Sequence, residues 1–571
     1  MEATIHTSSN QKPKIAIIGA GPTGLLSCRH LKDIADVTVF EAKSTVGGIW
    51  NYSDITTDNH PNLAQDPFFQ LYGNLHSSLY ADLVCNLPRH CMTYKDFPHK
   101  KNMPYVLNSK QFLQYLNDYS DHFKLRGWVE FETLVISVNL TKNVSNTEIE
   151  NLGLNSEEPR KFIVTTMRMD KPEAKKHRFY DYVIVCNGHY SKPFIPKIPG
   201  QEEFEGKQIH THDVRTIDPE LFHKKNVLIL GTNISANDQI HLLLGERARD
   251  QKVEVNKIFI TGTNMKFLPN STEFAPWMKA GKLVLKGAEA KPMPPVQSES
   301  SRSGSWLSRW FGRGGYQHVP NEESKEAPSS NSFFSCCSRR RKGTNANPSA
   351  GIEKSQNPPV TPQASTPKEG VKCLGKGFEV TFNDGTTETV HTIIYATGYL
   401  HSLPFLTNTS DNIIEFPKDD PGFYFGPLYM RTFAIKEPSL IFIGLCSRII
   451  PVHPTYERQV MLVKQGIEGK VKLPSQSQML AELEEELKKY DASSYGRKGY
   501  YLFGSNYTAT QFNQDMLKMN TLEEDESYQV ITPIEETLIN CFLAGNIGHL
   551  KTLNYGQFLD GVPYFPTSSK F

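Results

Sequence analysis

The sequence lacks any long run of apolar side chains. No stretch of its 571 residues approaches the ~20 apolar residues that a helix needs to cross a bilayer, and its first residues, MEATIHTSSNQKP, are polar. We therefore expect neither a transmembrane segment nor a secretory signal.

Paired cysteines are lacking too. The nine cysteines include no CxxC pair and no zinc-type spacing, so we expect no metal site. Scattered cysteines favour reduced thiols in an intracellular setting. The predicted location is the cytoplasm.

Neither sign of charge is in excess. The 62 basic and 61 acidic side chains give a formal net charge of +1, so no overall field draws the chain to nucleic acid. We expect no nucleic-acid partner. At roughly 150 residues per domain, the length predicts three or four structural units.

The sequence is rich instead in short apolar runs that end in glycine and alternate with helix-like segments. Examples are KIAIIGAG, DYVIVCNG, NVLILGT and HTIIYATG. This alternation is typical of parallel sheets covered by helices. The predicted fold class is α/β, with more than one Rossmann-like dinucleotide-binding unit.

The clearest motif is KIAIIGAGPTGLLSCRHL, in which a strand is followed by a glycine-rich turn and a helix. Gly19 permits the turn, Gly21 lets backbone amides approach a pyrophosphate, and Gly24 permits close packing of helix on strand. Glu41 closes the next strand and can accept the ribose hydroxyls. The expected contacts within this loop are Gly19, Ala20, Gly21, Pro22, Thr23 and Gly24.

The run FEAKSTVGGIWNY follows at once, and here the sequence resembles the flavin-containing monooxygenase family. The resemblance implies that FAD binds at the first loop, with Gly48, Ile49 and Trp50 beside it. Trp50 either walls the isoalloxazine ring or fills the core.

The segment LYADLVCNLPRHCMTYKDFP also resembles the family. By that likeness Cys85 and Asn86 lie beside the flavin, and Asn86 is the catalytic residue that hydrogen-bonds the reduced or oxygenated cofactor. The alternative is an asparagine that forms a local turn before Leu87.

The stretch FEGKQIHTHDV carries Phe204, Gly206 and His210 in the spacing FxGxxxH. It resembles the fingerprint shared by this family and the Baeyer-Villiger monooxygenases, although Val214 stands where the former usually has Tyr or Phe and the latter Trp. We interpret His210 as a linker residue, with a core or hinge histidine as the alternative.

The stretch VLILGTNISANDQI resembles a second nucleotide loop, at which the family is expected to bind NADPH. Asn233 replaces the middle glycine. Asparagine tolerates positive φ better than other non-glycine residues, so the turn can survive, although its side chain crowds the pyrophosphate. The expected contacts are Gly231, Asn233, Ser235, Ala236, Asn237 and Asp238.

The strand that follows, KIFITGTNMK, has no acid where an NAD site would place one for the ribose 2′-hydroxyl. This absence favours NADPH, but the arginine expected from the family is not evident. Lys266 is the predicted replacement, with Thr261, Thr263 and Asn264 as alternatives.

The segment TIIYATGY, with Ala396, Thr397 and Gly398, resembles the crossover back to the FAD domain. Serine, proline, glycine, glutamine and charge dominate the region from 287 to 372, which predicts a long disordered insertion. We thus expect a discontinuous FAD-binding domain, an NADPH-binding domain and an insertion within the latter, at 1–190 with 399–571, at 191–398 and at 287–372.

Further along, EPSLIFIGLCSRIIPVHPTYERQ resembles a family segment that approaches the flavin. Glu457 and Gln459 are its candidates, and residues on a surface helix are the alternative. The chain ends in Ser569-Lys570-Phe571, only distantly similar to the peroxisomal Ser-Lys-Leu address.

The insertion contains SWLSRWFGRGG and SFFSCCSRRRKG, where aromatic residues and cysteines adjoin arginines. Two interpretations stay open. One is a solvated loop, and the other is peripheral contact with an anionic membrane.

The resemblance implies an FAD- and NADPH-dependent monooxygenase of the dimethylaniline type. It would insert one oxygen atom of O2 into an amine nitrogen or a sulfur through a flavin hydroperoxide. The alternatives are a Baeyer-Villiger enzyme, which Val214 argues against, and a flavin-bound interaction protein without catalysis. A disulfide reductase would need a redox pair, and Cys85 and Cys91 have five residues between them.

Overall fold

The computed structural model describes three long stretches of the chain and a few residues after them. These are residues 12–286 with gaps at 76, 82, 101, 105, 246–252 and 263–273, residues 370–446 with a gap at 408–411, residues 452–491, and residues 497, 499–502, 512, 515–516 and 518–519. The predicted insertion lies outside the described residues up to 369, and so do the membrane interpretation, Lys266 and the C-terminal tripeptide.

The first sheet has seven strands in the order β20-β21-β22-β9-β1-β2-β5. Its five strands from β22 to β5 are parallel, and β20 and β21 extend it as an antiparallel hairpin. Strands buried on both faces need continuous apolar runs, which the first strand, KIAII, supplies. The bounds are β1 (Lys14–Ile18), β2 (Asp36–Phe40), β5 (Val129–Glu130), β9 (Tyr182–Val185), β20 (Leu428–Tyr429), β21 (Phe433–Ala434) and β22 (Leu440–Phe442).

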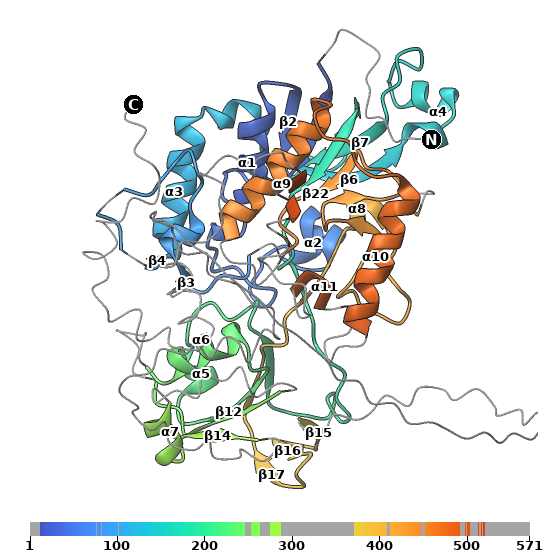
Figure 1. Cartoon of the computed structure of the whole chain (residues 1–571). Coiled ribbons are helices and arrows are strands. Elements are labelled where there is room, and N and C mark those ends of the chain that lie inside the picture. The colour runs from blue at the N-terminus through green and yellow to red at the C-terminus, as the bar shows by residue number, and fades with distance from the viewer. Residues whose placement is uncertain are drawn as a thin grey trace, which may run out of the picture. The chain divides into compact units, whose positions relative to one another are not determined.

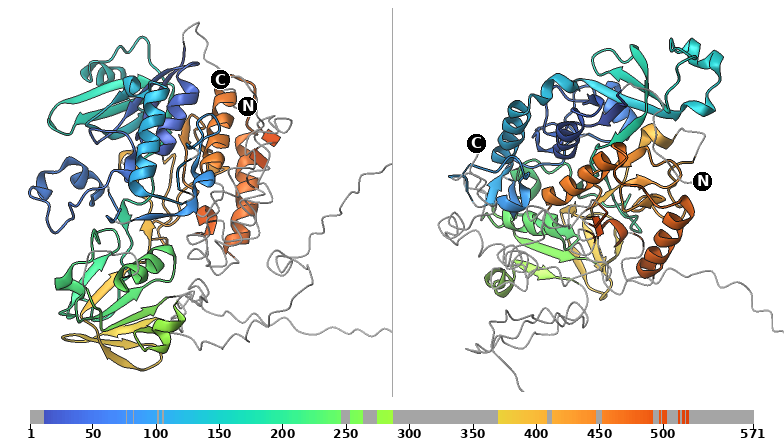
Figure 2. Two further views of the ribbon diagram at one scale, coloured as in Figure 1. Left: turned by 90° about the vertical axis from the view of Figure 1, so that its left-hand side faces the viewer. Right: turned by 45° about the horizontal axis from the view of Figure 1, so that its top comes forward.

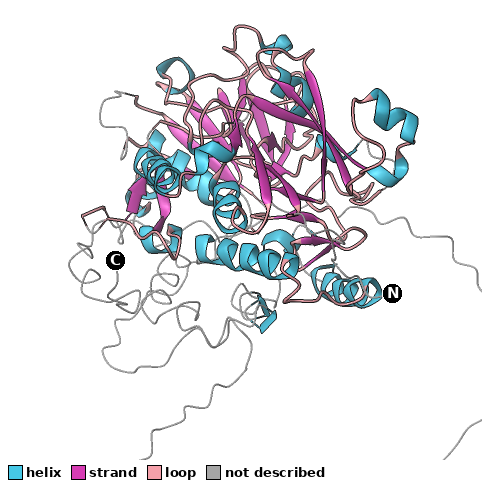
Figure 3. Cartoon of the chain, turned by 90° about the horizontal axis from the view of Figure 1, so that it is seen from above, coloured by secondary structure: helices cyan, strands magenta, loops and turns pink. Residues whose placement is uncertain are grey.

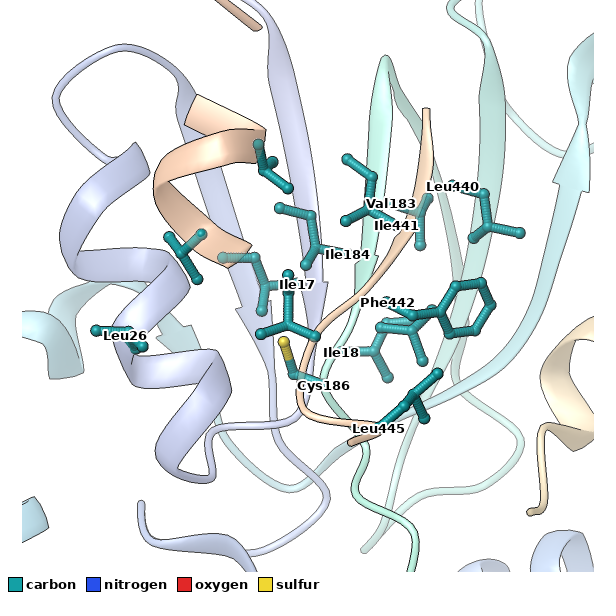
Figure 4. Close-up of a cluster of buried hydrophobic side chains, with 14 of the residues drawn as sticks. Ile17, Ile18, Leu26, Val183, Ile184, Cys186, Leu440, Ile441, Phe442 and Leu445 are labelled. Carbon is teal, nitrogen blue, oxygen red and sulfur yellow. The ribbon is translucent and has the colours of Figure 1, made fainter. Parts of the chain in front are cut away.

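Two helices, α1 (Pro22–Leu31) and α9 (Val452–Ile467), pack against each other beside this sheet (Figure 1). Buried side chains of β1, β9 and β22 belong to one hydrophobic cluster, as Figure 4 shows, and Leu26 of α1 is part of it. Cys186 is among them, at the end of β9. This packing places the start of α1 at the carboxyl edge of the parallel strands.

The second sheet has five parallel strands in the order β11-β18-β12-β13-β14. In Figure 2 its strands, drawn in green to yellow, group apart from those of the first sheet. The bounds are β11 (Lys207–His210), β12 (Asn226–Leu230), β13 (Lys257–Thr261), β14 (Leu283–Leu285) and β18 (Thr392–Tyr395), with helices α5 (Pro219–Phe222), α6 (Ile234–Leu243) and α7 (Ala275–Lys279).

Each sheet is accompanied by a three-stranded antiparallel sheet. A turn at 383–385 joins β16 to β17. The bounds are β6 (Thr133–Leu140), β7 (Phe162–Arg168) and β8 (Lys175–Tyr180) for one, and β15 (Val371–Leu374), β16 (Glu379–Phe382) and β17 (Thr387–Thr389) for the other.

Helices surround the strands in Figure 3. Helix α10 spans Gln476–Asp491. Among the described helices, none is both long and apolar enough to cross a membrane. Other elements are α2 (Pro67–Tyr72), β3 (Val84–Pro88), β4 (Val106–Asn108), α3 (Ser109–His122), α4 (Asn146–Asn151), β10 (Lys192–Pro193), β19 (Tyr399–Leu400), α8 (Pro404–Thr407) and α11 (Gly499–Leu502).

The predicted α/β class and its Rossmann-like parallel sheets are therefore confirmed. Two crossings of the chain connect the sheets, and β10 pairs with β19 where they meet. The domain boundaries given above stay predictions.

Candidate functional site

The loop between β1 and α1 contains three glycines with different tasks. Gly19 has a φ of +102°, and a Cβ atom on Gly24 would lie 1.8 Å from the carbonyl oxygen of Gly19. The fold itself therefore requires both. Gly21 differs, because its φ is −74° and a Cβ atom there would meet nothing closer than Gly48 Cα at 3.6 Å. The space beside Gly21 is room that the protein does not fill.

The predicted GGxW run lies directly against this loop. Gly48 has a φ of +56°, and a Cβ atom on it would come within 2.9 Å of Gly21 Cα. Ile49 and Trp50 follow in a short 3-10 helix, and the Trp50 ring packs edge-on against Phe112 at a centroid distance of 4.5 Å. Of the two interpretations of Trp50, this contact supports a side chain that leans on the core.

Glu41 braces the same loop. Its carboxylate is 3% exposed and accepts hydrogen bonds from the backbone amides of Ala20 at 2.7 Å and Lys43 at 2.9 Å. Burial raises the pKa of Glu41, while these two amides favour the ionised form. The carboxylate thus fixes the loop, and its contact with a ribose stays a prediction.

A second brace comes from α9. Gly444 has a φ of +87°, and a Cβ atom on it would lie 2.6 Å from Thr23 Cγ2 in the loop. The Gln459 amide holds this residue, since its oxygen accepts from Gly444 N at 3.4 Å and its nitrogen donates to Thr432 Oγ1 at 2.8 Å. Gly444 was not among the residues predicted from the sequence, although a glycine that ends a buried apolar run was its signal.

Glu457 and Gln459 are 2% and 0% exposed. The alternative that they lie on a surface helix is therefore wrong. Glu457 accepts a hydrogen bond from Lys95 N at 3.0 Å, and His30 Nε2 lies 3.3 Å from its carboxylate.

Asn86 lies on β3, between two residues that face the core. Cys85 and Leu87 are 3% and 9% exposed, and side chains alternate along a strand, so Asn86 points to the other face. No hydrogen bond joins its amide to another residue in the part of the chain that the structure describes. The amide is half-buried and available to a ligand. Cys85, by contrast, belongs to the hydrophobic core.

The second loop, between β12 and α6, turns at Gly231. Its φ is +121°, and a Cβ atom there would lie 2.3 Å from the carbonyl oxygen of Ala396. Asn233 has φ −94° and ψ −169°, an extended conformation, and its side chain is exposed. The expectation of a positive φ at Asn233 was wrong, because the turn occurs two residues earlier, at Gly231.

The other expected contacts on α6 differ in their burial and in their hydrogen-bond partners. Ser235 is exposed and Ala236 is buried in the core. Asn237 Oδ1 is buried without a hydrogen-bond partner in the described structure, and as an acceptor it suits an N–H or O–H donor and not a phosphate oxygen. The Asp238 carboxylate already accepts a hydrogen bond from Tyr80 Oη at 2.7 Å.

The end of β13 offers no carboxylate. Gly262 follows the strand, and a Cβ atom on it would lie 3.0 Å from Thr232 Cγ2. Thr261 is fully buried, which disfavours it as a contact of a ribose phosphate. Thr263 and Asn264 lie outside the described residues, as Lys266 does.

The linker residues meet at the crossings. His210 Nε2 donates to the carbonyl oxygen of Gly398 at 3.1 Å, and His210 Nδ1 accepts from His212 N at 3.0 Å. Burial lowers the pKa of His210 to about 4, so the imidazole is neutral and both nitrogens are used. Thr397 Oγ1 donates to the carbonyl oxygen of Phe194.

Phe204, from the same motif, fills a cluster on the second sheet. Val214, its last position, is 2% exposed and packs with Tyr80 in another cluster. The motif thus builds the junction between the sheets, which agrees with the linker interpretation of His210.

Both loops fit a dinucleotide. Gly21 and Asn233 stand at the N-cap positions before helices α1 and α6. Neither residue caps its helix with a side chain, and neither first turn contains an acid. Their first backbone amides are therefore open to an anion. Together with the space at Gly21, this makes two candidate phosphate cradles, one at each parallel sheet.

This arrangement defines a protein with two Rossmann-like parallel sheets, each with a candidate phosphate-binding loop. The family model described as flavin-binding monooxygenase-like matches residues 12–251 and 368–519. The chain belongs to this family and is a flavoprotein monooxygenase, as its resemblance predicted. The predicted flavin cofactor agrees with the family, and NADPH stays a prediction.

Several relatives match over most of their length. A flavin-containing monooxygenase, FMO GS-OX-like 9 of Arabidopsis thaliana, is 28% identical over 84% of this chain and 81% of its own. Flavin-containing monooxygenase 3 of Rattus norvegicus is 25% identical over 84% and 78%. The S-allyl-L-cysteine S-oxygenase of Allium sativum has a similar fold, with a TM-score of 0.63, 22% identity and coverage of 95% and 94%.

Proposed function

We propose that the chain uses FAD and NADPH to insert one oxygen atom of O2 into a soft nucleophile, an amine nitrogen or a sulfur. The observation that carries this proposal is the pair of uncapped helix starts, one at each parallel sheet, in a chain of the flavin-binding monooxygenase-like family. One sheet would hold the flavin and the other its reductant.

The first loop is the proposed FAD cradle. The backbone amides at the start of α1 would bind the pyrophosphate, because the space at Gly21 permits close approach. Glu41 and Gln459 would keep this loop in place through the contacts described above. When bound, FAD would supply the redox chemistry, through the flavin hydroperoxide that the resemblance implies.

The second loop is the proposed NADPH cradle. Gly262 stands at the end of β13, where an NAD-specific site would place an acid. The absence of a carboxylate at this position removes the repulsion that a 2′-phosphate would meet. This favours NADPH over NADH.

Asn86 is the proposed residue at the flavin ring. Its amide is uncommitted and can both donate and accept a hydrogen bond. In this role the Asn86 side chain would orient the reactive part of the cofactor and exclude water. Oxygen transfer to the substrate would then need no acid–base triad from the protein.

The competing functions make different demands. A disulfide reductase needs an active disulfide, but Cys85 and Cys91 are buried thiols. A Baeyer-Villiger enzyme would oxidise ketones, and a flavin-bound interaction protein would not be reduced by NADPH.

Anaerobic stopped-flow mixing of the FAD-loaded protein with NADPH or NADH tests the proposal. We expect NADPH to bleach the flavin faster than NADH at equal concentration. The reduced protein is then mixed with O2 and a sulfide, N,N-dimethylaniline or a cyclic ketone. Product from the sulfide or amine supports the proposal, product from the ketone alone supports the Baeyer-Villiger alternative, and no bleaching supports the non-catalytic one.

A further inference from the structure

Arg215 is a buried cation whose hydrogen bonds all go to backbone carbonyls. Its side chain is 6% exposed. Nε and Nη2 donate to the Ile55 oxygen at 3.3 and 3.1 Å, Nη2 donates to Ser77 at 2.8 Å, and Nη1 donates to Leu79 at 3.4 Å and to His212. A desolvated guanidinium is costly unless its donors are satisfied, and here the carbonyls satisfy it.

Three of these carbonyls belong to one stretch of chain, residues 51–81, which we call the bridging segment. It begins directly after Trp50 at the first loop and ends shortly before β3, which carries Asn86. Arg215 itself follows β11 of the second sheet. One side chain therefore ties the second sheet to the segment that runs from the proposed FAD cradle to the strand of Asn86.

Further contacts tie the same segment at separate points. Arg215 also accepts a backbone hydrogen bond from Ala81 N at 2.9 Å. His212 Nε2 donates to the Leu75 oxygen at 3.0 Å, and Lys207 pairs with Asp58 at 2.6 Å. At its far end, Tyr80 reaches Asp238 on α6, the helix of the proposed NADPH cradle.

We propose that Arg215 is a positioning residue for the reduction of the flavin. By holding the bridging segment at Ile55, Ser77 and Leu79, it fixes the flavin-side loop and β3 relative to α6. The proposal rests on the proposed transfer of a hydride from NADPH to FAD, which is sensitive to placement, since an error of about 1 Å can cost roughly 100-fold in rate.

The planar guanidinium is suited to this task. It presents five N–H donors in a fixed fork, whereas a lysine offers a single point from which three donors radiate. Lysine at this position keeps the charge but cannot reach carbonyls on several sides. The Arg215→Lys variant therefore removes the geometry and leaves the charge.

The test compares Arg215→Lys and Arg215→Met with the wild-type protein, each loaded with FAD. Anaerobic reduction by saturating NADPH is followed by stopped flow, and amide hydrogen exchange is measured over the bridging segment. We expect reduction to slow by roughly 10- to 100-fold in both variants and exchange at Ala81 to accelerate. Reduction by dithionite should be equal in all three proteins.

The matched control is Arg160→Met. Arg160 pairs with Asp181, next to the start of β1 and β9, at the edge of the first sheet opposite the loop. The Arg160→Met variant loses the same group as Arg215→Met, a guanidinium. We expect its melting temperature to fall and its rate of reduction by NADPH to stay unchanged.

The outcomes separate this inference from the proposed function. Wild-type protein that NADPH does not reduce overturns both. If the wild-type protein is reduced and Arg215→Lys is reduced at the same rate, only the inference about Arg215 fails. It fails as well if reduction slows while exchange at Ala81 stays unchanged. Should Arg215→Met not fold, Arg215→Lys alone decides.

Discussion

Substitution of the first-loop glycines by alanine separates binding from folding. A methyl group at Gly21 would touch only Gly48 Cα at 3.6 Å, an ordinary contact, and the φ of −74° suits alanine. A methyl group at Gly24 would lie 1.8 Å from a backbone oxygen that cannot move aside. The two substitutions add the same atoms in neighbouring places but meet different surroundings.

The magnitudes follow from these surroundings. Gly21→Ala should change the stability of the FAD-free protein by less than about 1 kcal/mol, because the loss of a favourable cap and the stiffer unfolded chain oppose each other. A displaced hydrogen bond to a charged phosphate costs about 1.5–3 kcal/mol. FAD affinity should thus fall roughly 10- to 100-fold. Gly24→Ala should destabilise the protein by about 3 kcal/mol or more.

The assay is urea unfolding of the FAD-free proteins together with titration of FAD by fluorescence quenching. We expect Gly21→Ala to keep the unfolding midpoint and lose affinity, and Gly24→Ala to lose stability. An FAD affinity of Gly21→Ala within threefold of wild type would refute the assignment of this space to the pyrophosphate.

Two further predictions concern the second loop and the response to acid. The NADPH affinity of Asn233→Gly, measured by calorimetry, should stay within about threefold of the wild-type value, because Asn233 is extended and its side chain is exposed. A large gain in affinity would show that this side chain crowds the cofactor. Burial lowers the pKa of His453 from 6.5 to about 3, so the folded state disfavours the proton that the unfolded state binds below 6.5. Through this group, the free energy of unfolding should fall by about 2 kcal/mol from pH 7.5 to 5. The His453→Phe variant keeps the ring contacts with Tyr94 and Phe112 and should lose less stability over the same pH range. An equal loss in the variant would contradict this role of His453.

Local patterns were sufficient to predict the two loops. A buried strand, a turn at Gly19 or Gly231 and a helix are each visible within twenty residues of sequence. The parallel order of the strands follows from the same alternation. The conformation of Asn233 was not predictable, because the position of a turn within a short loop depends on contacts such as that between Gly231 and Ala396.

Contacts between distant segments could not be predicted. Gln459 reaches Gly444 only because α9 packs behind the first loop. Whether Glu457 and Gln459 lie at the surface or in the core depends on the burial of this helix. Arg215 resembles any charged residue after a motif until the carbonyls of the bridging segment are seen around it. Such partners are brought together by the tertiary fold and leave no periodic pattern in the sequence.

The proposed reaction is the reduction of the flavin by NADPH followed by transfer of one atom of O2 to a nucleophile. The most direct measurement is turnover of a sulfide or tertiary amine with NADPH under isotopically labelled O2, followed by mass spectrometry of the product. We expect one labelled oxygen atom in each product molecule and one NADPH consumed for it. Product oxygen that comes from water, or NADPH consumption that yields only hydrogen peroxide with every substrate, would contradict it.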